Sequence, residues 1–512
     1  MADNLASFKV FCQGGLNTSR DVLSQGETQP GSAISLINYE PAVTGGYRKI
    51  NGFSNDYGTV TGTGSVLGVC VANGINDGIL ACRTPSSGNN YLHKWNTTTS
   101  AWDAVTTAGS PTMTGVTKVR FTKYNWGSPK VLLTDGINPA ATYDGTTYTQ
   151  ITHANAPSAP KFSHVFKNHL FLTGDPSEPT NLYFSAPYDE TDFSSASGAN
   201  VINVGFPIVA IKSFRDVLYI FGTNNIRKLA GNNISDFVLQ EVTDDLGCLA
   251  TDSVIEIGGD LLFLSQDGLR PVSGTDKIGD VNLETVSKDI QSIFTDVVFE
   301  IDLEELNAVV IRQKTQFRYF FGAAESQGII GGFRQTPNGL QFEYGQMLGI
   351  TATCADSGYI GQNEFVIHGD STGKVHRQEQ GNDFDGTNIF SLFQTPFFHM
   401  QDPEQRKVFY NVATYLRSEG DNEIVMSALY DYEDVDTLSP TNFTLTTTGA
   451  AAYYNEALYD STAIFDGNPA PVKRTNISGS GKSASFKFVT NDSNASHSIQ
   501  GLVVTFGVGD RL

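Results

Sequence analysis

The sequence predicts a mostly β protein, in which a β-propeller is joined to a β-sandwich-like domain formed by the C-terminal region and an N-terminal arm. Three observations predict this fold: a recurring two-strand unit, a composition suited to short strands, and a change of pattern near residue 396. In the recurring unit, an apolar run meets a turn rich in Gly, Asp or Asn, and a second apolar run follows.

The recurring unit begins at seven places along the chain. Its starts lie at residues 66, 118, 163, 210, 253, 308 and 353, so successive units are 43 to 55 residues apart. A period of about 40–50 residues with several strands per unit is typical of a β-propeller. We therefore expect about six to eight blades, with seven favoured.

The composition suits strands and tight turns. Gly accounts for 51 of the 512 residues, and Phe (33) and Tyr (20) far outnumber Met (5) and Trp (3). Aromatic and β-branched residues favour strands, and glycine favours the turns between them. Residues 282–294 are the one stretch with apolar positions at helical spacing, which predicts a short helix there.

The pattern divides the chain into three parts. Residues 1–50 do not form a repeat and are expected to be an arm that docks on another element. Residues 51–395 carry the repeats, with a helical insertion near 282–305. Residues 396–512 have longer alternating strands and loops rich in Thr, Ser, Asn and Gly, which is typical of an antiparallel sandwich.

The charge is strongly acidic, with 33 Lys and Arg against 54 Asp and Glu and a net charge of −21. This balance argues against tight wrapping of nucleic acid, which requires cationic contacts to phosphates. It is compatible with DNA sliding through a pore, because an acidic wall repels a polyanion. A soluble acidic surface is the simpler alternative.

The cysteines and the first residues favour synthesis in a reducing cytosol. The five cysteines are scattered and form no C-x-x-C pair, so single buried thiols are favoured. The first residues lack the basic start and apolar core of a signal peptide, and no run is long enough to span a bilayer.

Motifs in the sequence predict no catalytic, cofactor-binding or metal-binding residues. Residues 478–483 (SGSGKS) lack the first glycine of a phosphate loop, and residues 383–386 (DFDG) lack the ligand spacing of a calcium loop, so both are interpreted as turns. No zinc spacing, nucleophile elbow or sialidase-type turn motif occurs. With 54 acidic residues, a pair of catalytic carboxylates remains an alternative.

Several short segments, taken in order, carry a resemblance to a known family. They are Gly14-Gly15-Leu16-Asn17, Asn38-Tyr39-Glu40, the stretch GYRKINGF at 46–53, the stretch NHLFLTGDP at 168–176, LYFS at 182–185, and the close at 499–509. Together they resemble the tail nozzle proteins of short-tailed bacteriophages, also called tail tubular protein B or DNA-stabilisation proteins. Lys49 and Phe53 are mild departures from the family pattern.

The resemblance implies a virion structural protein rather than an enzyme. It implies a homohexameric ring at the distal end of a short tail, below the portal and the tail adaptor. It also implies a channel that retains genomic DNA and passes it during ejection without sequence-specific binding, and docking faces for tail fibres or tailspikes. The protein would be made in the bacterial cytoplasm and would reside in the virion.

Within this picture, the arm and the C-terminal domain are the parts expected to contact other subunits and the adaptor. The candidate contact residues are Tyr39, Tyr47, Phe53, Phe397 and Phe398, with packing in the core as the alternative for each. Removal of residues 1–50 is expected to abolish ring assembly and to leave the propeller folded.

Two other functions remain open. The first is a glycan-binding adhesin on a propeller scaffold. The second is a glycan-processing propeller, which requires two convergent carboxylates and an aromatic platform in the central pocket. The oligomeric state separates these from a nozzle, because both would act as monomers.

Overall fold

The computed structural model describes most of the chain. The described residues are 5–42, 45–109, 111, 113–273, 285–322, 326–336, 339–400, 402–434, 436–447 and 472–508. Some segments treated above lie partly outside these ranges. They include residues 282–284 of the expected helix and residues 448–471 and 509–512 of the expected C-terminal domain.

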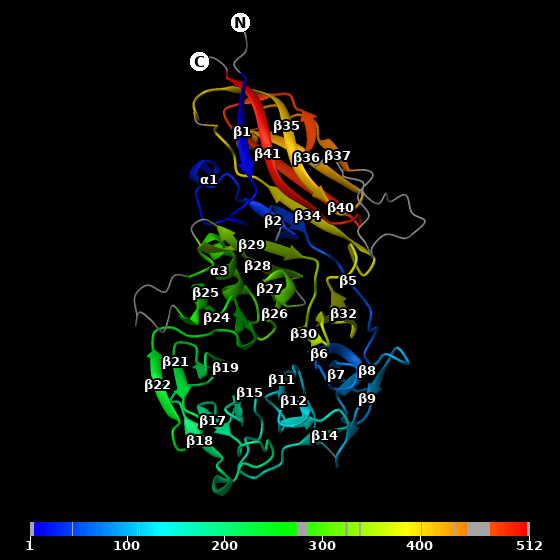
Figure 1. Ribbon diagram of the computed structural model, residues 1–512, viewed down its shortest axis with the longest axis vertical. Helices are drawn as coiled ribbons and strands as arrows, with labels where there is room; N and C mark the ends of the chain where they lie inside the picture. Colours follow the sequence, from blue (N-terminus) through cyan, green and yellow to red (C-terminus); the bar gives the residue numbers. More distant parts are fainter. Residues whose placement is uncertain are drawn as a thin grey trace.

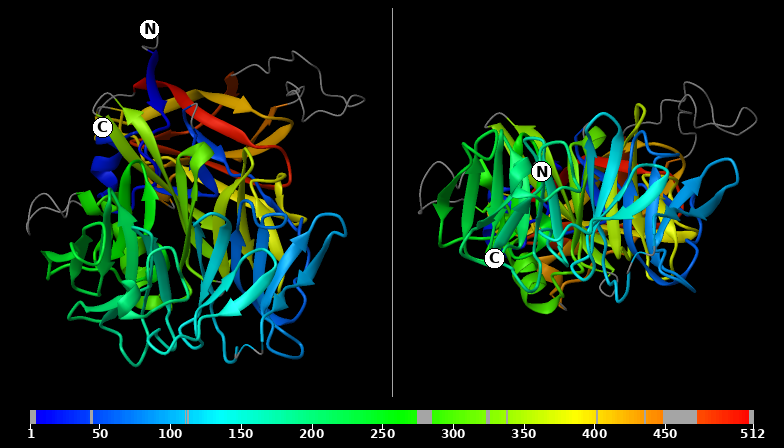
Figure 2. Two further views of the ribbon diagram at one scale, coloured as in Figure 1. Left: turned by 60° about the horizontal axis from the view of Figure 1, so that its bottom comes forward. Right: turned by 90° about the horizontal axis from the view of Figure 1, so that it is seen from below.

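The protein is mostly β, as predicted, and its strands form a propeller-like ring and a large mixed sheet (Figure 1). Five small sheets form the propeller-like part, at the end of the molecule opposite the chain termini (Figures 1 and 2). We call the end that carries both termini the terminal pole. The propeller-like arrangement is thus confirmed.

Each small sheet is built from strands that follow one another along the chain. The first contains β6 (Thr63–Val71), β7 (Ile79–Thr84), β8 (Leu92–Asn96) and β9 (Ala101–Ala104). The second contains β10 (Thr106–Thr107), β11 (Arg120–Asn125), β12 (Pro129–Thr134), β13 (Ala141–Tyr143) and β14 (Thr147–Gln150). The third contains β15 (Phe162–Phe166), β16 (His169–Thr173), β17 (Asn181–Phe184) and β18 (Asn200–Asn203), and the fourth contains β19 (Ala210–Phe214), β20 (Val217–Phe221), β21 (Ile226–Ala230) and β22 (Val238–Thr243). The fifth contains β23 (Ile255–Ile257), β24 (Asp260–Ser265) and β25 (Gly268–Pro271).

The turn between the first and second strands has the same backbone form in three of these sheets. Lys167 and Asn168 have φ of 47° and 64°, Arg215 and Asp216 have 47° and 69°, and Gly258 and Gly259 have 64° and 76°. Two consecutive residues of positive φ form the tight turn whose twist matches that of a hairpin. The recurring turn signals of the sequence therefore correspond to recurring hairpins.

Apolar side chains fill the space between neighbouring small sheets. Phe171 and Phe184 of the third sheet pack with Leu218 and Ile220 of the fourth in one buried cluster. The strand β16 is buried at all five positions because a sheet covers each of its faces. This explains why the strands of the ring have continuous apolar runs, where a half-exposed strand would alternate.

The large sheet has eleven strands along its main path and is nearly closed, like a barrel. In order these are β26 (Asn307–Ile311), β27 (Gln316–Phe320), β28 (Gln327–Thr336), β29 (Gly339–Leu348), β2 (Ser35–Ile37), β34 (Thr387–Gln394), β33 (Asp383–Phe384), β5 (Phe53–Ser54), β32 (Val375–Gln378), β31 (Asn363–Gly369) and β30 (Cys354–Ile360). The first and last of these strands contact each other, and β30 also contacts β6 of the first small sheet. The units that begin near residues 308 and 353 are joined into this one sheet, because β2, β34, β33 and β5 lie between them and pair with both.

A second sheet, which we call the terminal sheet, covers the large sheet at the terminal pole. It contains β1 (Leu5–Phe11), β3 (Tyr39–Pro41), β4 (Tyr47–Lys49), β35 (Lys407–Ser418), β38 (Val472–Asn476), β39 (Ser480–Gly481) and β41 (His497–Val508). It faces a branch of the large sheet made of β36 (Asn422–Tyr430), β37 (Phe443–Thr447) and β40 (Ala484–Asp492). The ring of Phe409 stacks on that of Tyr430 across this interface, with 4.9 Å between centroids. One core cluster contains residues from both sides of residue 396, such as Leu264 and Val504, so packing is continuous across that position.

The helices differ from the prediction. The helix α3 spans Gln291–Glu300 and follows the short helix η3 (Lys288–Ile290), so among the described residues of this stretch helical structure begins at Lys288 and continues past the predicted end at residue 294. Ile290 and Phe294 are buried as the spacing predicts. A second helix, α1 (Val22–Thr28), was not predicted; it begins where the Asp21 side chain accepts a hydrogen bond from the Ser24 amide at 2.8 Å. The described helices include none long and apolar enough to cross a membrane.

All five cysteines are buried free thiols, as predicted. They are Cys12, Cys70, Cys82, Cys248 and Cys354. Burial raises the pKa of each of these thiols, to about 11 for Cys248, so they remain protonated at neutral pH.

A buried network of charges joins the N-terminal segment to the large sheet and to the strand β35. We call it the junction network; its members are Glu40, Arg48, Lys314, Arg318, Glu379 and Glu419. Glu40 lies 3.1 Å from Arg48, 2.7 Å from Lys314 and 3.5 Å from Arg318.

Arg318 and Lys314 also contact Glu379, and Arg48 contacts Glu419 through two nitrogens. Burial alone would raise the pKa of Glu379, but the charges of Arg318 and Lys314 outweigh it and hold that pKa well below its usual range.

The substitution Arg318→Met tests the junction network. Arg318 is fully buried, so its loss leaves Glu40 and Glu379 short of a partner in the interior. We expect the free energy of unfolding to fall by about 3–5 kcal/mol, measured by chemical denaturation. The control Lys482→Met removes an ion pair whose side chains are 56% and 81% exposed, and should cost less than about 1 kcal/mol. Equal effects of the two substitutions would contradict the importance of the network.

Candidate assembly surface and cavities

The five aromatic residues expected at subunit contacts lie in the interior of the single chain. Tyr39 and Tyr47 are fully buried and Phe53 is nearly so. The Tyr39 hydroxyl lies 2.8 Å from His497 Nε2, and the Tyr47 hydroxyl donates to the Gly31 carbonyl at 2.6 Å. These hydrogen bonds hold the N-terminal segment against the terminal sheet.

Phe53, Phe397 and Phe398 are also buried within the single chain. Phe53 packs edge-on against the rings of His368 and His376, with 4.9 Å between centroids in both cases. Phe397 lies 4.5 Å from the Tyr432 ring, and Phe398 is fully buried. All five side chains therefore serve as core, and this placement does not support them as contacts to a second subunit.

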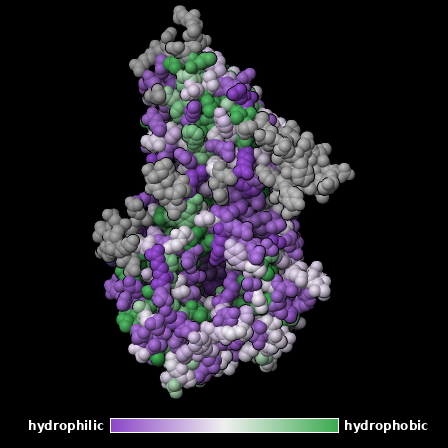
Figure 3. Space-filling view, in the orientation of Figure 1, coloured by the Kyte–Doolittle hydropathy of each residue, from purple (hydrophilic) through white to green (hydrophobic). Residues whose placement is uncertain are grey.

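A different set of apolar residues is exposed, on the outer face of the terminal sheet. We call this set the terminal face; it consists of Leu5, Phe11, Val408, Tyr410 and Tyr415, which are between 39% and 68% exposed. Apolar surface gathers over this pole (Figure 3). Contiguous exposed apolar surface in a folded protein marks an interaction site.

Strand register explains why these side chains share a face. Leu5 of β1 and Val408 of β35 both lie opposite Gly507 of β41. Phe11 and Tyr415 both lie opposite Gly501 in the same way. At Gly507 and again at Gly501, apolar side chains of β1 and β35 thus lie on both sides of β41, while Ser7 and Lys9 of β1 share the face between them.

The strand β1 also leaves one edge open. Among the described strands, it pairs only with β41, from Leu5 opposite Gly507 to Phe11 opposite Gly501. An edge strand with unpaired backbone groups is a template for another strand. The open edge lies beside Leu5 and Phe11, the most exposed members of the terminal face.

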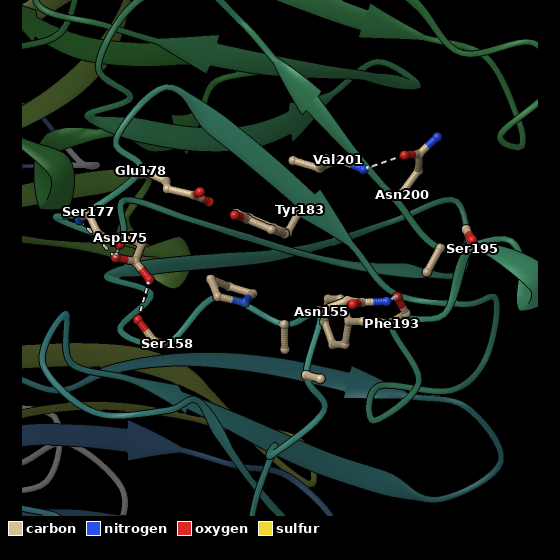
Figure 4. Close-up of a pocket in the computed structure, with 14 residues that line it drawn as sticks. Asn155, Ser158, Asp175, Ser177, Glu178, Tyr183, Phe193, Ser195, Asn200 and Val201 are labelled. Atoms are coloured by element: carbon tan, nitrogen blue, oxygen red, sulfur yellow. Dashed lines mark hydrogen bonds between the residues drawn. The ribbon is translucent and has the colours of Figure 1, made fainter.

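A pocket of about 510 Å³ lies beside the outer strands of the third small sheet (Figure 4). We call it the rim pocket. Its lining includes the aromatic rings of Tyr183 and Phe193 and the carboxylates of Asp175 and Glu178, and no Lys or Arg lines it among the described residues. The hydroxyl end of Tyr183 points toward Glu178 across the pocket (Figure 4).

Asp175 in this pocket is fully occupied by hydrogen bonds. Its Oδ1 accepts from the amide and hydroxyl of Ser177, and its Oδ2 accepts from the Ser158 hydroxyl and the Ala159 amide. Burial would raise the pKa of Asp175, but these bonds outweigh it and lower the pKa. A general acid at neutral pH needs a raised pKa, so Asp175 is unsuited to that role.

A smaller cavity of about 210 Å³ lies where the first strands of the sheets converge, and we call it the axial cavity. Its lining comes from β11, β15, β19, the short helix η2 (Thr251–Ser253) with the following Val254, β26 and β30. The middle of the ring is hollowed (Figure 3). The lining includes Arg120, His164, Lys212 and Asp252.

One mouth of the axial cavity is closed by paired charges. Asp252 lies 2.7 Å from Lys118 and 2.9 Å from Arg120, and Glu304 lies 3.2 Å from Arg120 and 2.5 Å from Lys161. Burial would raise the pKa of Asp252, but Arg120 and Lys118 outweigh it and lower the pKa to about 2. Each of these three cations is therefore paired with at least one of the two carboxylates.

Residues 383–386 form a turn in the structure, whereas residues 478–483 contain the short strand β39 and its flanking loops. The Asp383 side chain accepts a hydrogen bond from the Gly386 amide at 2.8 Å. The amides of Lys482 and Ser483 donate to the Asp431 carboxylate, so they are not available to a phosphate. Within the described ranges, no group of three or more His, Cys, Asp or Glu side chains could hold a metal ion.

Comparison with known proteins gives no match by sequence. No family model matches the chain, and no curated protein matches it. Among solved structures, the computationally designed Ika8 protein is similar over 62% of this chain and 98% of its own, at 9% identity and a TM-score of 0.35. An ancestral GH74 enzyme is similar over 83% of this chain and 63% of its own, at 9% identity and a TM-score of 0.39. At these scores, the similarities carry no conclusion about function.

Proposed function

We propose that the chain is a virion structural protein, a tail nozzle that forms a homohexameric ring at the distal end of a short phage tail. The terminal face is the observation that carries this proposal. Leu5, Phe11 and Tyr415 lie on one exposed face beside an open strand edge, which suits a surface that another subunit covers. The ordered resemblance of the end segments to the nozzle family supports the same assignment.

The shape of the molecule suits a division of labour. The N-terminal arm and the C-terminal strands would form a sandwich-like base that assembles the ring and docks on the tail adaptor. We propose seven blades for the propeller, namely the five small sheets and two more formed by β26–β29 and β30–β32 within the large sheet. The blades would lie away from the base and present their faces to tail fibres or tailspikes.

The acidic balance suits a channel for DNA. Each subunit carries a net charge of −21, so a ring of these subunits would repel the phosphate backbone. DNA would then be retained and passed during ejection by sliding, without sequence-specific contacts. The protein would act in the virion after synthesis in the bacterial cytoplasm.

Analytical ultracentrifugation and electron microscopy of the purified protein test the ring. We expect a six-subunit ring in the wild type, and monomers with an unchanged circular dichroism spectrum in the double variant Phe11→Ser, Tyr415→Ser. The matched control is Tyr188→Ser, Leu438→Ser, which changes two exposed apolar residues outside the terminal face and should keep the ring. A wild type that stays monomeric up to about 100 µM would contradict the proposal.

The structure calls for a narrower truncation than removal of residues 1–50. That deletion removes Leu36, Tyr39 and Tyr47 from the core and two members of the junction network, so the remainder is not expected to stay folded. Removal of residues 1–11 instead deletes the strand β1 and leaves β2, β3 and β4 in place.

Glycan binding is a second candidate function, favoured by the rim pocket. Aromatic rings, carboxylates and amides without a cation suit a neutral sugar and disfavour an anionic one. The pocket lies at the third small sheet and not in the centre of the ring, where the sequence had placed a glycan site.

Saturation-transfer NMR with neutral oligosaccharides tests this second function. We expect Tyr183→Ala to abolish a signal that Tyr188→Ala retains, because Tyr188 is 64% exposed outside the pocket. Failure of every neutral oligosaccharide tested to bind the wild type would exclude glycan binding.

A further inference from the structure

Two buried histidines lie under the strand β5, where the N-terminal segment joins the large sheet. His368 of β31 and His376 of β32 are 1% and 4% exposed, and their rings stack with 4.9 Å between centroids. The Phe53 ring, on β5, packs edge-on against both of them, and β30 places Ala355 opposite His368. Because β5 has only two residues, Phe53 and Ser54, its hold on the sheet depends on this packing as well as on strand pairing.

A chain of hydrogen bonds connects these histidines to the junction network. Arg318 Nη1 donates to Gln378 Oε1 at 2.9 Å, and Gln378 Nε2 lies 3.2 Å from His368 Nδ1. An amide nitrogen only donates, so His368 Nδ1 is the acceptor and the proton of the neutral ring lies on Nε2. Gln378 also lies directly opposite Phe53 in the pairing of β32 with β5. We call Arg318, Gln378, His368 and His376 the histidine relay.

A second proton on His368 has no acceptor in this arrangement. It would add to Nδ1, which already accepts from Gln378, so two donors would face each other. Gln378 cannot turn to accept this proton without pointing its amide nitrogen at Arg318, which is also only a donor. His376 gives no relief, because its Nε2 lies 3.2 Å from Asp370 Oδ2 and its buried Nδ1 has no hydrogen-bond partner among the described residues. Protonation of His368 therefore costs a hydrogen bond of the relay.

The charged and titratable groups that face His368 come from three places. Arg318 lies on β27, His376 lies on β32, and Asp370 lies in the turn between β31 and β32. Among these three, Asp370 alone favours a positive charge on His368. Burial and the charges of His376 and Arg318 outweigh Asp370 and lower the pKa of His368 from its ordinary value of 6.5 to about 3. The ring is therefore neutral at pH 7.

We propose that the histidine relay is an acid-sensitive latch, which holds β5 against β32 at neutral pH and releases it once His368 is protonated. Release removes the contact between two donors at Gln378 and lets water reach the charged ring. Because the released state takes up the proton more readily than the latched state, the latch is strongest above pH 6.5 and weakens as the pH falls towards 3. Loss of the pairing at Phe53 would loosen the N-terminal segment next to the junction network.

Amide hydrogen exchange at pH 7 and pH 5, corrected for intrinsic rates, tests the latch. In the wild type, the opening equilibrium of β5 should rise about tenfold or more on acidification, since a pKa of about 3 against 6.5 allows up to about 25-fold. In His368→Asn, the side-chain oxygen can replace Nδ1 as acceptor but does not titrate, so the rise should be less than about twofold. The control His153→Asn removes a histidine whose side chain is 30% exposed, and it should behave as the wild type.

A second measurement uses only the wild-type protein. Exchange of the imidazole C2 hydrogens, followed by mass spectrometry, reports the titration of each histidine, and we expect His368 to titrate below about pH 5. Titration of His368 near 6.5 in the folded protein would overturn the proposal. So would an equal pH dependence of β5 in the wild type and in His368→Asn. Neither result depends on ring assembly, because the relay lies in the interior of a single chain.

Discussion

The fold depends on buried ion pairing between segments that are distant in sequence. Glu40 and Arg48 belong to the N-terminal segment, Arg318 lies on β27 of the large sheet, Lys314 and Glu379 lie in its connections, and Glu419 directly follows β35. Charges in the interior are tolerated only when they are paired, so each carboxylate requires its partners to be in place. The N-terminal segment is thereby locked between the ring and the terminal sheet, and this locking brings β1 to the position where its outer edge stays open.

The sequence predicted the local elements better than their assembly. Recurring turns such as Lys167–Asn168 and Arg215–Asp216 depend on a few neighbouring residues, so the repeated hairpins could be recognised. The insertion of β2 between β29 and β34 depends on contacts across hundreds of residues, and no local pattern encodes it. For the same reason, the units near residues 308 and 353 were expected as blades but are joined into one large sheet. The helix α1 was missed because it is short and depends on one capping residue, Asp21.

The residues of the assembly surface, like the assembly of the sheets, could not be predicted from local sequence patterns. Tyr39, Tyr47 and Phe53 were predicted as contact residues because they are aromatic, but all three are buried in the core. Aromatic residues occur both in cores and at interfaces, so aromatic character alone does not distinguish the two. Phe11 and Tyr415 form the exposed face, and their common exposure follows from their register on either side of β41. This face depends on non-local strand pairing, which no local pattern in the sequence encodes.

The central claim is that the terminal face, and not the ring of small sheets, joins copies of this chain. Hydrogen exchange measured on the assembled and the dissociated protein tests this claim most directly, because exchange reports backbone protection residue by residue. The account predicts that assembly slows exchange in β1 and β35 and leaves the strands of the small sheets unchanged. Protection gained on the small sheets, with β1 exchanging equally fast in both states, would contradict it.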